Sequence, residues 1–136
     1  MDAPITYCLL IKKPLPGNIK VGRLGTYNFP RGYYVYTGSA RRGIDARIKR
    51  HMVRKKRFHW HIDYLLEMGE IEEVYMFCRE ECEVSKEIFS MPGATLLVKK
   101  FGSSDCSCPS HLAYFGEKAP PGLNSMASGT IKKMFK

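Results

Sequence analysis

Strand-like and helix-like patterns alternate along the chain, beginning with runs of aliphatic, aromatic and β-branched residues. Thr6 to Lys12 is such a run and ends at Pro14, which predicts a buried strand followed by a turn. Glycines punctuate the next two runs, Ile19 to Arg23 and Gly25 to Phe29, and predict a hairpin or an irregular ribbon. Tyr33 to Thr37 contains only aromatic and β-branched residues, so it is the strongest strand signal in the chain.

The periodicity of the apolar residues changes after Gly43. From Ile44 onward they recur at helical spacing and predict a helix that reaches Lys56, and His59 to Met68 predicts a second helix. The remaining expected elements are a strand at Val74 to Cys78, an acidic helix at Glu80 to Phe89, a strand at Thr95 to Lys99, a loop from Phe101 to Ser110 and a strand at His111 to Phe115. Together these elements predict a small α+β domain.

The size and composition of the chain fit one domain. Its 136 residues are 44% apolar and 12% aromatic, which is enough for a core and excludes disordered, collagen-like and multidomain chains. We expect the domain to span residues 1–116, and residues 117–136, which include Pro120 and Gly122, to form a polar, mobile tail.

The N-terminus and the cysteines bear on the compartment. The chain opens with no signal-like pattern and has no apolar run long enough for a membrane span, so we expect a cytoplasmic protein. Five cysteines, an odd number, then predict reduced thiols or metal ligands rather than a disulfide framework.

The net charge of +9 is segregated into two blocks. Nine Lys and Arg face one acid between Arg41 and Arg57, whereas acids dominate from Asp63 to Glu87. A charge run is commonly a solvated helix face, but a dense basic block also suits a phosphate backbone, and we favour nucleic acid as the partner. A membrane surface is disfavoured because the basic helix lacks Trp, Phe and Leu. The candidate nucleic-acid ligands are Arg41, Arg42, Lys49, Arg50, Arg54, Lys55 and Lys56.

A candidate catalytic wall follows the tyrosine-rich strand. Arg47 and His51 are spaced i, i+4, so they share one helix face, at the edge of the apolar stripe that Ile44 begins. A strand end, a Gly38-Ser39 turn and a helix that carries a fixed cation together suit a phosphate. The alternative is that Arg47 and His51 are ordinary surface residues, which spacing alone does not separate.

Several of these residues resemble a known family. Tyr36-Thr37-Gly38, followed by Ile44-x-x-Arg47-x-x-x-His51, resembles the second half of the GIY-YIG nuclease signature, with one extra residue before Ile44. HWHIDYLL and FGSSDCSCPSHL, which begin at residues 59 and 101, resemble further blocks of the small Uri-type branch. The resemblance covers residues from about 6 to 115. It implies a mainly antiparallel central sheet flanked by helices and a DNA endonuclease, in repair or in defence against foreign DNA.

The first half of the signature departs from the family pattern. Ile5-Thr6-Tyr7 lacks the expected glycine, and the distance from Tyr7 to Tyr36 is longer than is usual in the family. Gly25-Thr26-Tyr27 keeps the glycine but lies on a poorer strand. We prefer Tyr7 because it belongs to the strand that enters the core, and Tyr27 stays open as the alternative.

The resemblance also implies a glutamate that holds one Mg²⁺ or Mn²⁺ ion. Glu81 is preferred because an aliphatic residue, Val84, follows it three positions later, and Glu83 is the second choice. In the implied reaction Tyr7 or Tyr36 deprotonates a water, which requires its pKa to fall from about 10 toward neutrality. Arg47 binds the phosphate, and His51 orients a tyrosine or relays a proton.

Cysteines and histidines predict a second metal site. Cys106, Cys108 and His111 offer three donors within six residues, and His59, His61 or Cys82 could complete a tetrahedral structural Zn²⁺ site. Buried thiols and a packed histidine are the alternative. Trp60, the single tryptophan, is interpreted as a core anchor.

Three functions compete at this level. The leading one is a metal-dependent DNA endonuclease, with RNA as an open alternative substrate. The second is a noncatalytic nucleic-acid-binding domain of the same fold, which the missing first glycine favours. The third is a protein-interaction domain whose acidic and basic faces pair with a partner.

Overall fold

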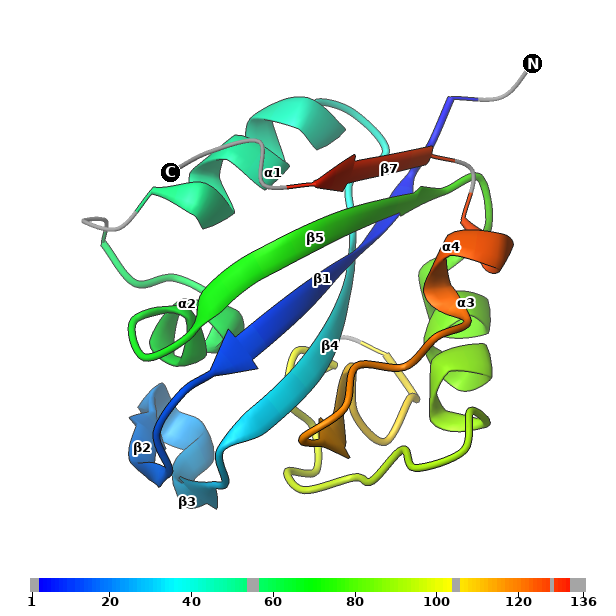
Figure 1. Cartoon of the computed structure of the whole chain (residues 1–136). Helices are drawn as coiled ribbons and strands as arrows, with labels where there is room; N and C mark the ends of the chain where they lie inside the picture. The colour runs from blue at the N-terminus through cyan, green and yellow to red at the C-terminus, as the bar shows by residue number, and fades with distance from the viewer. Residues whose placement is uncertain (1–2, 54–56, 104–105, 128, 133–136) are drawn as a thin grey trace.

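A five-stranded antiparallel sheet forms the centre of the protein (Figure 1). The computed structural model describes residues 3–53, 57–103, 106–127 and 129–132. Strand β1 (Thr6–Lys13) is the middle strand and pairs with β4 (Gly32–Ser39) and β5 (Glu70–Phe77). β6 (Leu112–Gly116) and β7 (Gly129–Lys132) form the two edges, so the strand order is β6-β4-β1-β5-β7. The predicted α+β fold class is confirmed.

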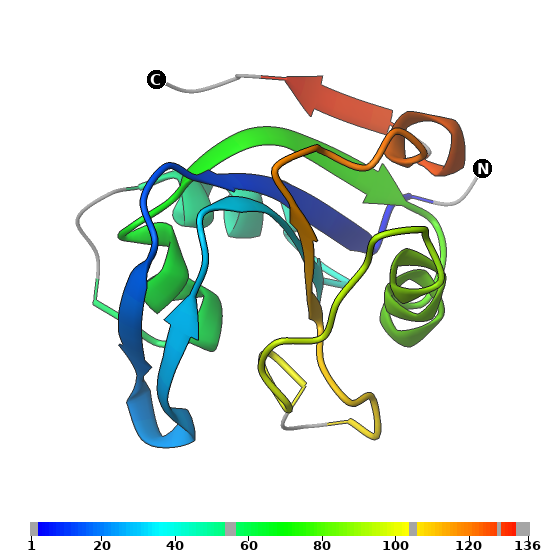
Figure 2. The ribbon, with the colours of Figure 1, turned by 60° about the horizontal axis from the view of Figure 1, so that its bottom comes forward.

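Side-chain alternation along β1 builds two apolar layers. Tyr7, Leu9 and Ile11 enter the larger cluster on one face of the sheet, whereas Cys8 and Leu10 enter the smaller cluster on the other. Helices α1 (Ile44–Met52) and α2 (His61–Leu66) cover the first face, since Ile48, Ile62, Leu65 and Leu66 belong to the larger cluster. Helices α3 (Glu81–Phe89) and α4 (Leu123–Met126) cover the second (Figure 2).

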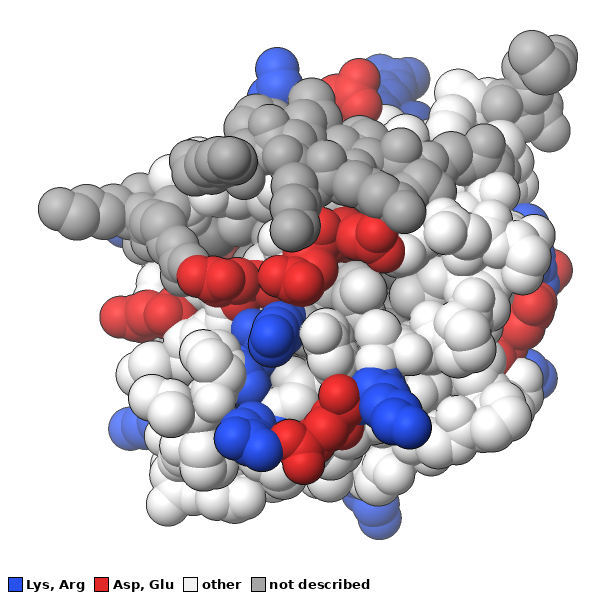
Figure 3. All heavy atoms as spheres, in the orientation of Figure 1, with Lys and Arg blue, Asp and Glu red and all other residues white. Residues whose placement is uncertain are grey.

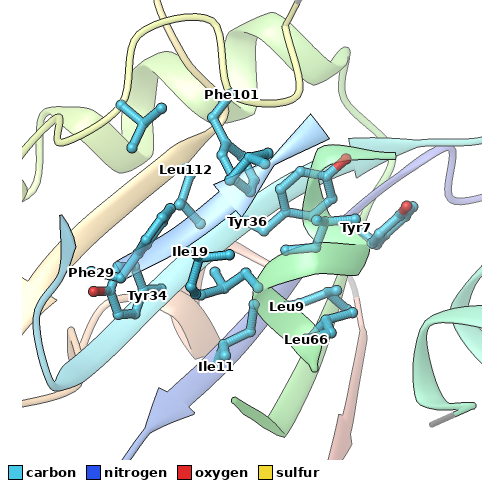
Figure 4. Close-up of a cluster of buried hydrophobic side chains, with 14 of the residues drawn as sticks. Tyr7, Leu9, Ile11, Ile19, Phe29, Tyr34, Tyr36, Leu66, Phe101 and Leu112 are labelled. Atoms are coloured by element: carbon cyan, nitrogen blue, oxygen red, sulfur yellow. The ribbon is translucent and has the colours of Figure 1, made fainter. Parts of the chain in front are cut away.

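The glycine-rich stretch after β1 forms the expected ribbon. β2 (Gly17–Val21) and β3 (Gly25–Phe29) pair in a separate two-stranded sheet, joined by a 3₁₀ turn, η1 (Gly22–Leu24). Ile19 and Phe29 lie inside the larger cluster, beside Tyr34 and Ile11 (Figure 4). The ribbon therefore extends the core on the face that carries Tyr7.

The predicted strand at Thr95 to Lys99 is wrong. Thr95 makes one isolated antiparallel bridge with Tyr114, through two backbone hydrogen bonds of 2.8 and 2.9 Å. The chain then leaves the edge of the sheet, because Val98 and Phe101 are buried in the larger cluster. A run of consecutive apolar residues does not distinguish such an anchored loop from a strand.

Two elements lie in the segment that the sequence analysis set apart as a tail. α4 follows Gly122 and buries Leu123 in the smaller cluster, and β7 pairs with β5 from Glu73 to Met76. The sheet thus extends to residue 132, beyond the expected boundary at 116, because one buried leucine and one short strand give almost no periodic signal. Helix α1, which was expected to reach Lys56, ends at Met52, and the backbone of Val53 is extended. Residues 54–56 lie outside the described part of the chain.

None of the helices in the described part of the chain combines the length and the apolar character that crossing a bilayer requires.

Candidate functional site

Two neighbouring strands bring Tyr7 and Tyr36 together. Tyr7 lies opposite Gly38 and Tyr36 lies opposite Leu9 in the antiparallel register, so both side chains occupy the same face of the sheet. Their ring centroids are 6.5 Å apart, and both hydroxyls lie at the same end of the cluster (Figure 4). Both tyrosines are buried.

Gly38 makes room for the Tyr7 phenol. A Cβ atom at this position would lie 2.5 Å from the Tyr7 hydroxyl oxygen and 2.6 Å from its ring carbon Cζ. No side chain can therefore stand there without moving Tyr7, which gives the glycine of the Tyr36-Thr37-Gly38 motif a steric reason. Gly102, with φ of 70°, has the same relation to Tyr36, since its Cβ would lie 2.8 Å from the ring.

Helix α1 directs Arg47 and His51 toward the tyrosines. The Tyr7 hydroxyl and His51 Nε2 are 2.6 Å apart in a buried hydrogen bond. Arg47 is half-buried and donates to the Ser39 carbonyl at 2.9 Å, which fixes its guanidinium at the end of β4. The i, i+4 pair therefore faces the sheet rather than solvent.

The ring of Trp60 packs against the guanidinium groups of two arginines. The Cζ atoms of Arg47 and Arg50 lie 4.5 and 4.3 Å from the centroid of its ring, within the range of cation–π attraction. Sequence reasoning interpreted Trp60 as a core anchor and missed this contact. The signal that could have found it is an aromatic residue at the start of the helix that follows the basic block.

Asp63 holds Arg50 and the start of α2. Its carboxylate accepts from Arg50 through both oxygens, at 3.0 Å each, and from the backbone N–H groups of His59 and Trp60 at 2.8 and 2.9 Å. Burial alone would raise the pKa of Asp63, but the hydrogen bonds from Arg50, Trp60 and His59 outweigh it and hold that pKa below its ordinary value. Sequence reasoning did not single out Asp63.

Helix α3 adds a carboxylate, that of Glu81, whose charge acts on the two tyrosines. Glu81 is the first residue of α3, and its carboxylate Oε2 lies 3.3 Å from His111 Nδ1. Its negative charge acts on the phenols of both Tyr7 and Tyr36. A carboxylate, a guanidinium, an imidazole and two phenols from four elements thus converge on one site.

The phenols of this site are not acidic in the protein alone. Burial raises the pKa of Tyr7 and of Tyr36 above the ordinary value. The charge of Arg47 acts in the opposite direction at both rings, and Glu81 and Asp63 reinforce the increase. Arg47 therefore lowers the pKa of both phenols, as the proposed reaction requires, but burial raises that pKa by more.

The alternative candidates for the first tyrosine and for the metal-binding glutamate, Tyr27 and Glu83, make other contacts. Tyr27 is on the ribbon and donates to the Leu24 carbonyl at 3.0 Å. Glu83 is 2.9 Å from Arg79 in an exposed ion pair, and Glu87 is 2.7 Å from the same guanidinium. Of each pair of alternatives, Tyr7 is the tyrosine that is hydrogen-bonded to His51, and Glu81 is the glutamate whose charge acts on Tyr7 and Tyr36.

The candidate nucleic-acid ligands divide into several groups. Arg42 and Lys49 are exposed, and Arg41 is an exposed partner of Glu80 at 2.9 Å. Arg50 is engaged by the buried carboxylate of Asp63. Three further candidates, Arg54, Lys55 and Lys56, lie outside the described residues. On the face shown in Figure 3 acidic side chains gather over β5 with basic ones nearby, so that face is not uniformly basic.

A second cluster can hold a metal ion. The ligand atoms of Cys82, Cys106, Cys108 and His111 all lie within 4.8 Å of one another. Cys82 comes from α3 and completes the set, whereas His61 accepts from the Gly102 N–H at 2.9 Å through Nδ1 and lies outside it. Burial, followed by the neighbouring thiols, raises the pKa of Cys108 to about 12, as crowded sulfurs resist ionisation without a cation. All five cysteines of the chain lie among the described residues, and no disulfide joins any of them.

The fold and these two sites define a small α+β domain in which a buried Tyr–His pair lies beside an arginine, a glutamate and a Cys₃His cluster. A model of the family described as "Domain of unknown function DUF123" matches residues 6–132, and the chain belongs to that family. No curated protein and no solved structure matches the chain significantly.

Proposed function

We propose that this protein is a metal-dependent endonuclease that hydrolyses DNA phosphodiester bonds, in the manner of the GIY-YIG superfamily and its small Uri-type branch. The observation that carries the proposal is the convergence of Tyr7 from β1, the Arg47–His51 pair from α1 and the charge of Glu81 from α3, three separate segments of the chain. The resemblance assigns these residue types to one reaction, and their proximity is what that reaction requires.

Tyr7 and His51 form the proton-transfer pair of the proposed reaction. One hydrogen occupies the 2.6 Å bond between the Tyr7 hydroxyl and His51 Nε2. Transfer of that proton to the imidazole leaves a phenolate that can take a proton from the attacking water. Because burial opposes the phenolate, the positive charge of Arg47 and of a bound cation must offset it.

Arg47 is the proposed phosphate ligand. Its planar fork offers several donors that match phosphate oxygens, and the same guanidinium hydrogen-bonds the Ser39 carbonyl and Tyr7. A phosphate ligand must also be held in place, and the ring of Trp60 does this by packing against the Arg47 guanidinium. Negative charge that develops on the phosphate is therefore stabilised by a cation that is already in place.

Glu81 is the proposed ligand of Mg²⁺ or Mn²⁺. Its side chain is 27% exposed, so it is accessible to a hydrated ion and to a substrate, and the contact with His111 uses one of its two oxygens. A hard cation with several waters needs only one or two carboxylate ligands together with the substrate phosphate. When bound, the ion would supply charge neutralisation at the leaving 3′ oxygen.

We propose Zn²⁺ as the metal of the second cluster. Three sulfurs and one imidazole are a common donor set of structural zinc sites. In a tetrahedral site with zinc–sulfur and zinc–nitrogen bonds of ordinary length, a sulfur and a nitrogen lie about 3.6 Å apart. Cys106 Sγ and His111 Nε2 are 3.5 Å apart, so the pair already has that spacing.

Cleavage assays test the proposed activity. The purified protein is incubated with supercoiled, single-stranded and branched DNA, with and without Mg²⁺, and with a single-stranded RNA as a further substrate. Metal-dependent nicking or cutting of at least one DNA substrate supports the proposal. Binding that weakens steeply with salt, without cleavage under any condition, would favour the noncatalytic nucleic-acid-binding domain. Absence of both would leave the protein-interaction function.

A further inference from the structure

The proposed zinc site and the proposed catalytic site share one side chain. His111 is buried, with 1% of its surface exposed, and its two ring nitrogens face different partners. Nε2 lies 3.5 Å from Cys106 Sγ, on the side of the thiols, and Nδ1 lies 3.3 Å from Glu81 Oε2. Among the described residues, Nδ1 has no hydrogen-bond partner of good geometry, although it is fully buried.

The two contacts of His111 match those that a metal-bound histidine commonly makes. A metal-bound histidine commonly ligates through one nitrogen and donates its other N–H to a carboxylate, which fixes the tautomer and the orientation of both groups. In this protein, zinc on Nε2 would leave the hydrogen on Nδ1, where the Glu81 carboxylate lies. The buried Nδ1 would then acquire the acceptor that a buried polar atom needs.

Helix α3 strengthens the link because it contributes to both sites. Glu81 and Cys82 are its first two residues, so one side chain belongs to the catalytic group and the next to the metal cluster. The loop that carries Cys106 and Cys108 is in turn tied to the sheet, since His111 donates its backbone N–H to Phe101 and accepts from Thr37 N–H, at 2.8 and 2.9 Å.

We infer that zinc bound by Cys82, Cys106, Cys108 and His111 positions the Glu81 carboxylate through the Nδ1–H of His111. Glu81 thereby accepts a hydrogen bond from a zinc-bound histidine and is also the proposed ligand of the catalytic ion. The inference rests on the zinc assignment of the proposed function, and it makes zinc occupancy a condition for an ordered catalytic carboxylate.

Zinc affinity tests this link without any nuclease assay. Zinc content is measured in the purified full chain by elemental analysis, and affinity by competition with a zinc-binding dye, for wild type, Glu81→Gln and Glu83→Gln. Loss of a carboxylate that hydrogen-bonds a metal-bound histidine typically weakens metal binding about 10- to 100-fold. We expect one zinc per chain, a weakening of about that size in Glu81→Gln, and wild-type affinity in Glu83→Gln, whose carboxylate faces Arg79.

A spectroscopic measurement gives an independent test. In long-range ¹H–¹⁵N correlation spectra of the zinc-loaded protein, His111 should show hydrogen on Nδ1 and metal on Nε2. Failure to take up zinc, an unchanged affinity in Glu81→Gln, an equal loss in Glu83→Gln, or metal on Nδ1 would each overturn the inference. Absence of DNA cleavage together with the expected zinc results would refute the nuclease proposal and leave this link intact.

Discussion

The hydroxyl of Tyr7 and Nε2 of His51 are 2.6 Å apart, although 44 residues separate them in the sequence. Tyr7 reaches this position from the central strand β1, and His51 reaches it from the last turn of α1. Both side chains are buried, so the hydrogen bond is shielded from water and holds the phenol in one orientation.

Removal of the Tyr7 hydroxyl should abolish most of the proposed activity. Tyr7→Phe keeps the ring but deletes the group that exchanges a proton with water, and general-base catalysis contributes about 10²- to 10⁴-fold. Cleavage should fall by that factor while DNA affinity changes little. The variant also deletes the buried hydrogen bond between Tyr7 and His51, at a cost of about 1–3 kcal/mol, so its unfolding must be measured alongside.

Tyr27→Phe is the matched control for this prediction. Its hydroxyl donates to Leu24 on the ribbon, and its loss should leave cleavage unchanged. Loss of cleavage in Tyr27→Phe with retention in Tyr7→Phe would reverse the assignment of the first tyrosine.

Gly38→Ala should destabilise the protein through Tyr7. The new methyl group would lie 2.5 Å from a hydroxyl that is buried and hydrogen-bonded, so the phenol must shift and the pair with His51 must lengthen. Overpacking of this kind costs about 1–3 kcal/mol. Thermal unfolding measures it, and Gly17→Ala is the control, since a Cβ there meets only Lys13 Nζ at 3.9 Å. Equal stability of the two variants would contradict the steric role of Gly38.

Asp63→Asn should lower stability at neutral pH and flatten its pH dependence. The variant removes a charge that is bonded to Arg50, and we expect a loss of about 2–4 kcal/mol, less than for a fully buried pair because the Arg50 side chain is 29% exposed. Since the folded pKa of Asp63 lies below the unfolded value of about 3.9, its contribution is complete above that pH and is lost as the pH falls further.

Urea unfolding at pH 7 and at pH 3 measures this dependence. The stability difference between wild type and Asp63→Asn should be larger at pH 7 than at pH 3. Asp45→Asn, which alters an exposed acid on α1, should show no such change. A difference that stays constant with pH would mean that the Asp63 carboxylate is not specially stabilised.

Trp60→Ala should weaken catalysis through Arg47 rather than through substrate contact. A cation–π contact is worth about 0.5–2 kcal/mol, which corresponds to a decrease in kcat/KM of roughly 2- to 30-fold. Trp60→Phe keeps an aromatic face and should recover most of the loss. If Trp60→Phe were as impaired as Trp60→Ala at equal stability, the ring contact would not be what positions Arg47.

Local patterns predicted the parts of the site that a single element controls. The i, i+4 spacing of Arg47 and His51 predicted a shared helix face, and the strand character of Tyr33 to Thr37 placed Tyr36 in the sheet. The acidic helix was also predicted, with Glu81 preferred on the basis of the family resemblance.

Long-range packing determined the rest. Cys82 joins Cys106 and Cys108 only because α3 and the loop before β6 meet in the folded protein. Sequence spacing does not predict a contact between such distant segments. Trp60 lies against Arg47 because the start of α2 meets the side chains of the second half of α1, a relationship that sequence periodicity does not encode. Thr95 and the residues of β7 depend on single pairings at the sheet edges, where the propensity of a few residues decides little.

The most direct test is Mg²⁺-dependent cleavage by four variants that separate the converging residues from their neighbours. Arg47→Ala and Glu81→Gln alter the proposed phosphate and metal ligands, whereas Asp45→Asn and Glu83→Gln alter exposed residues on the same two helices. Each variant is compared with wild type for DNA cleavage, for DNA affinity and for unfolding. We predict that Arg47→Ala and Glu81→Gln bind DNA but lose cleavage by at least about 10²-fold, and that both controls cleave like wild type. Full activity of either Arg47→Ala or Glu81→Gln would contradict the account.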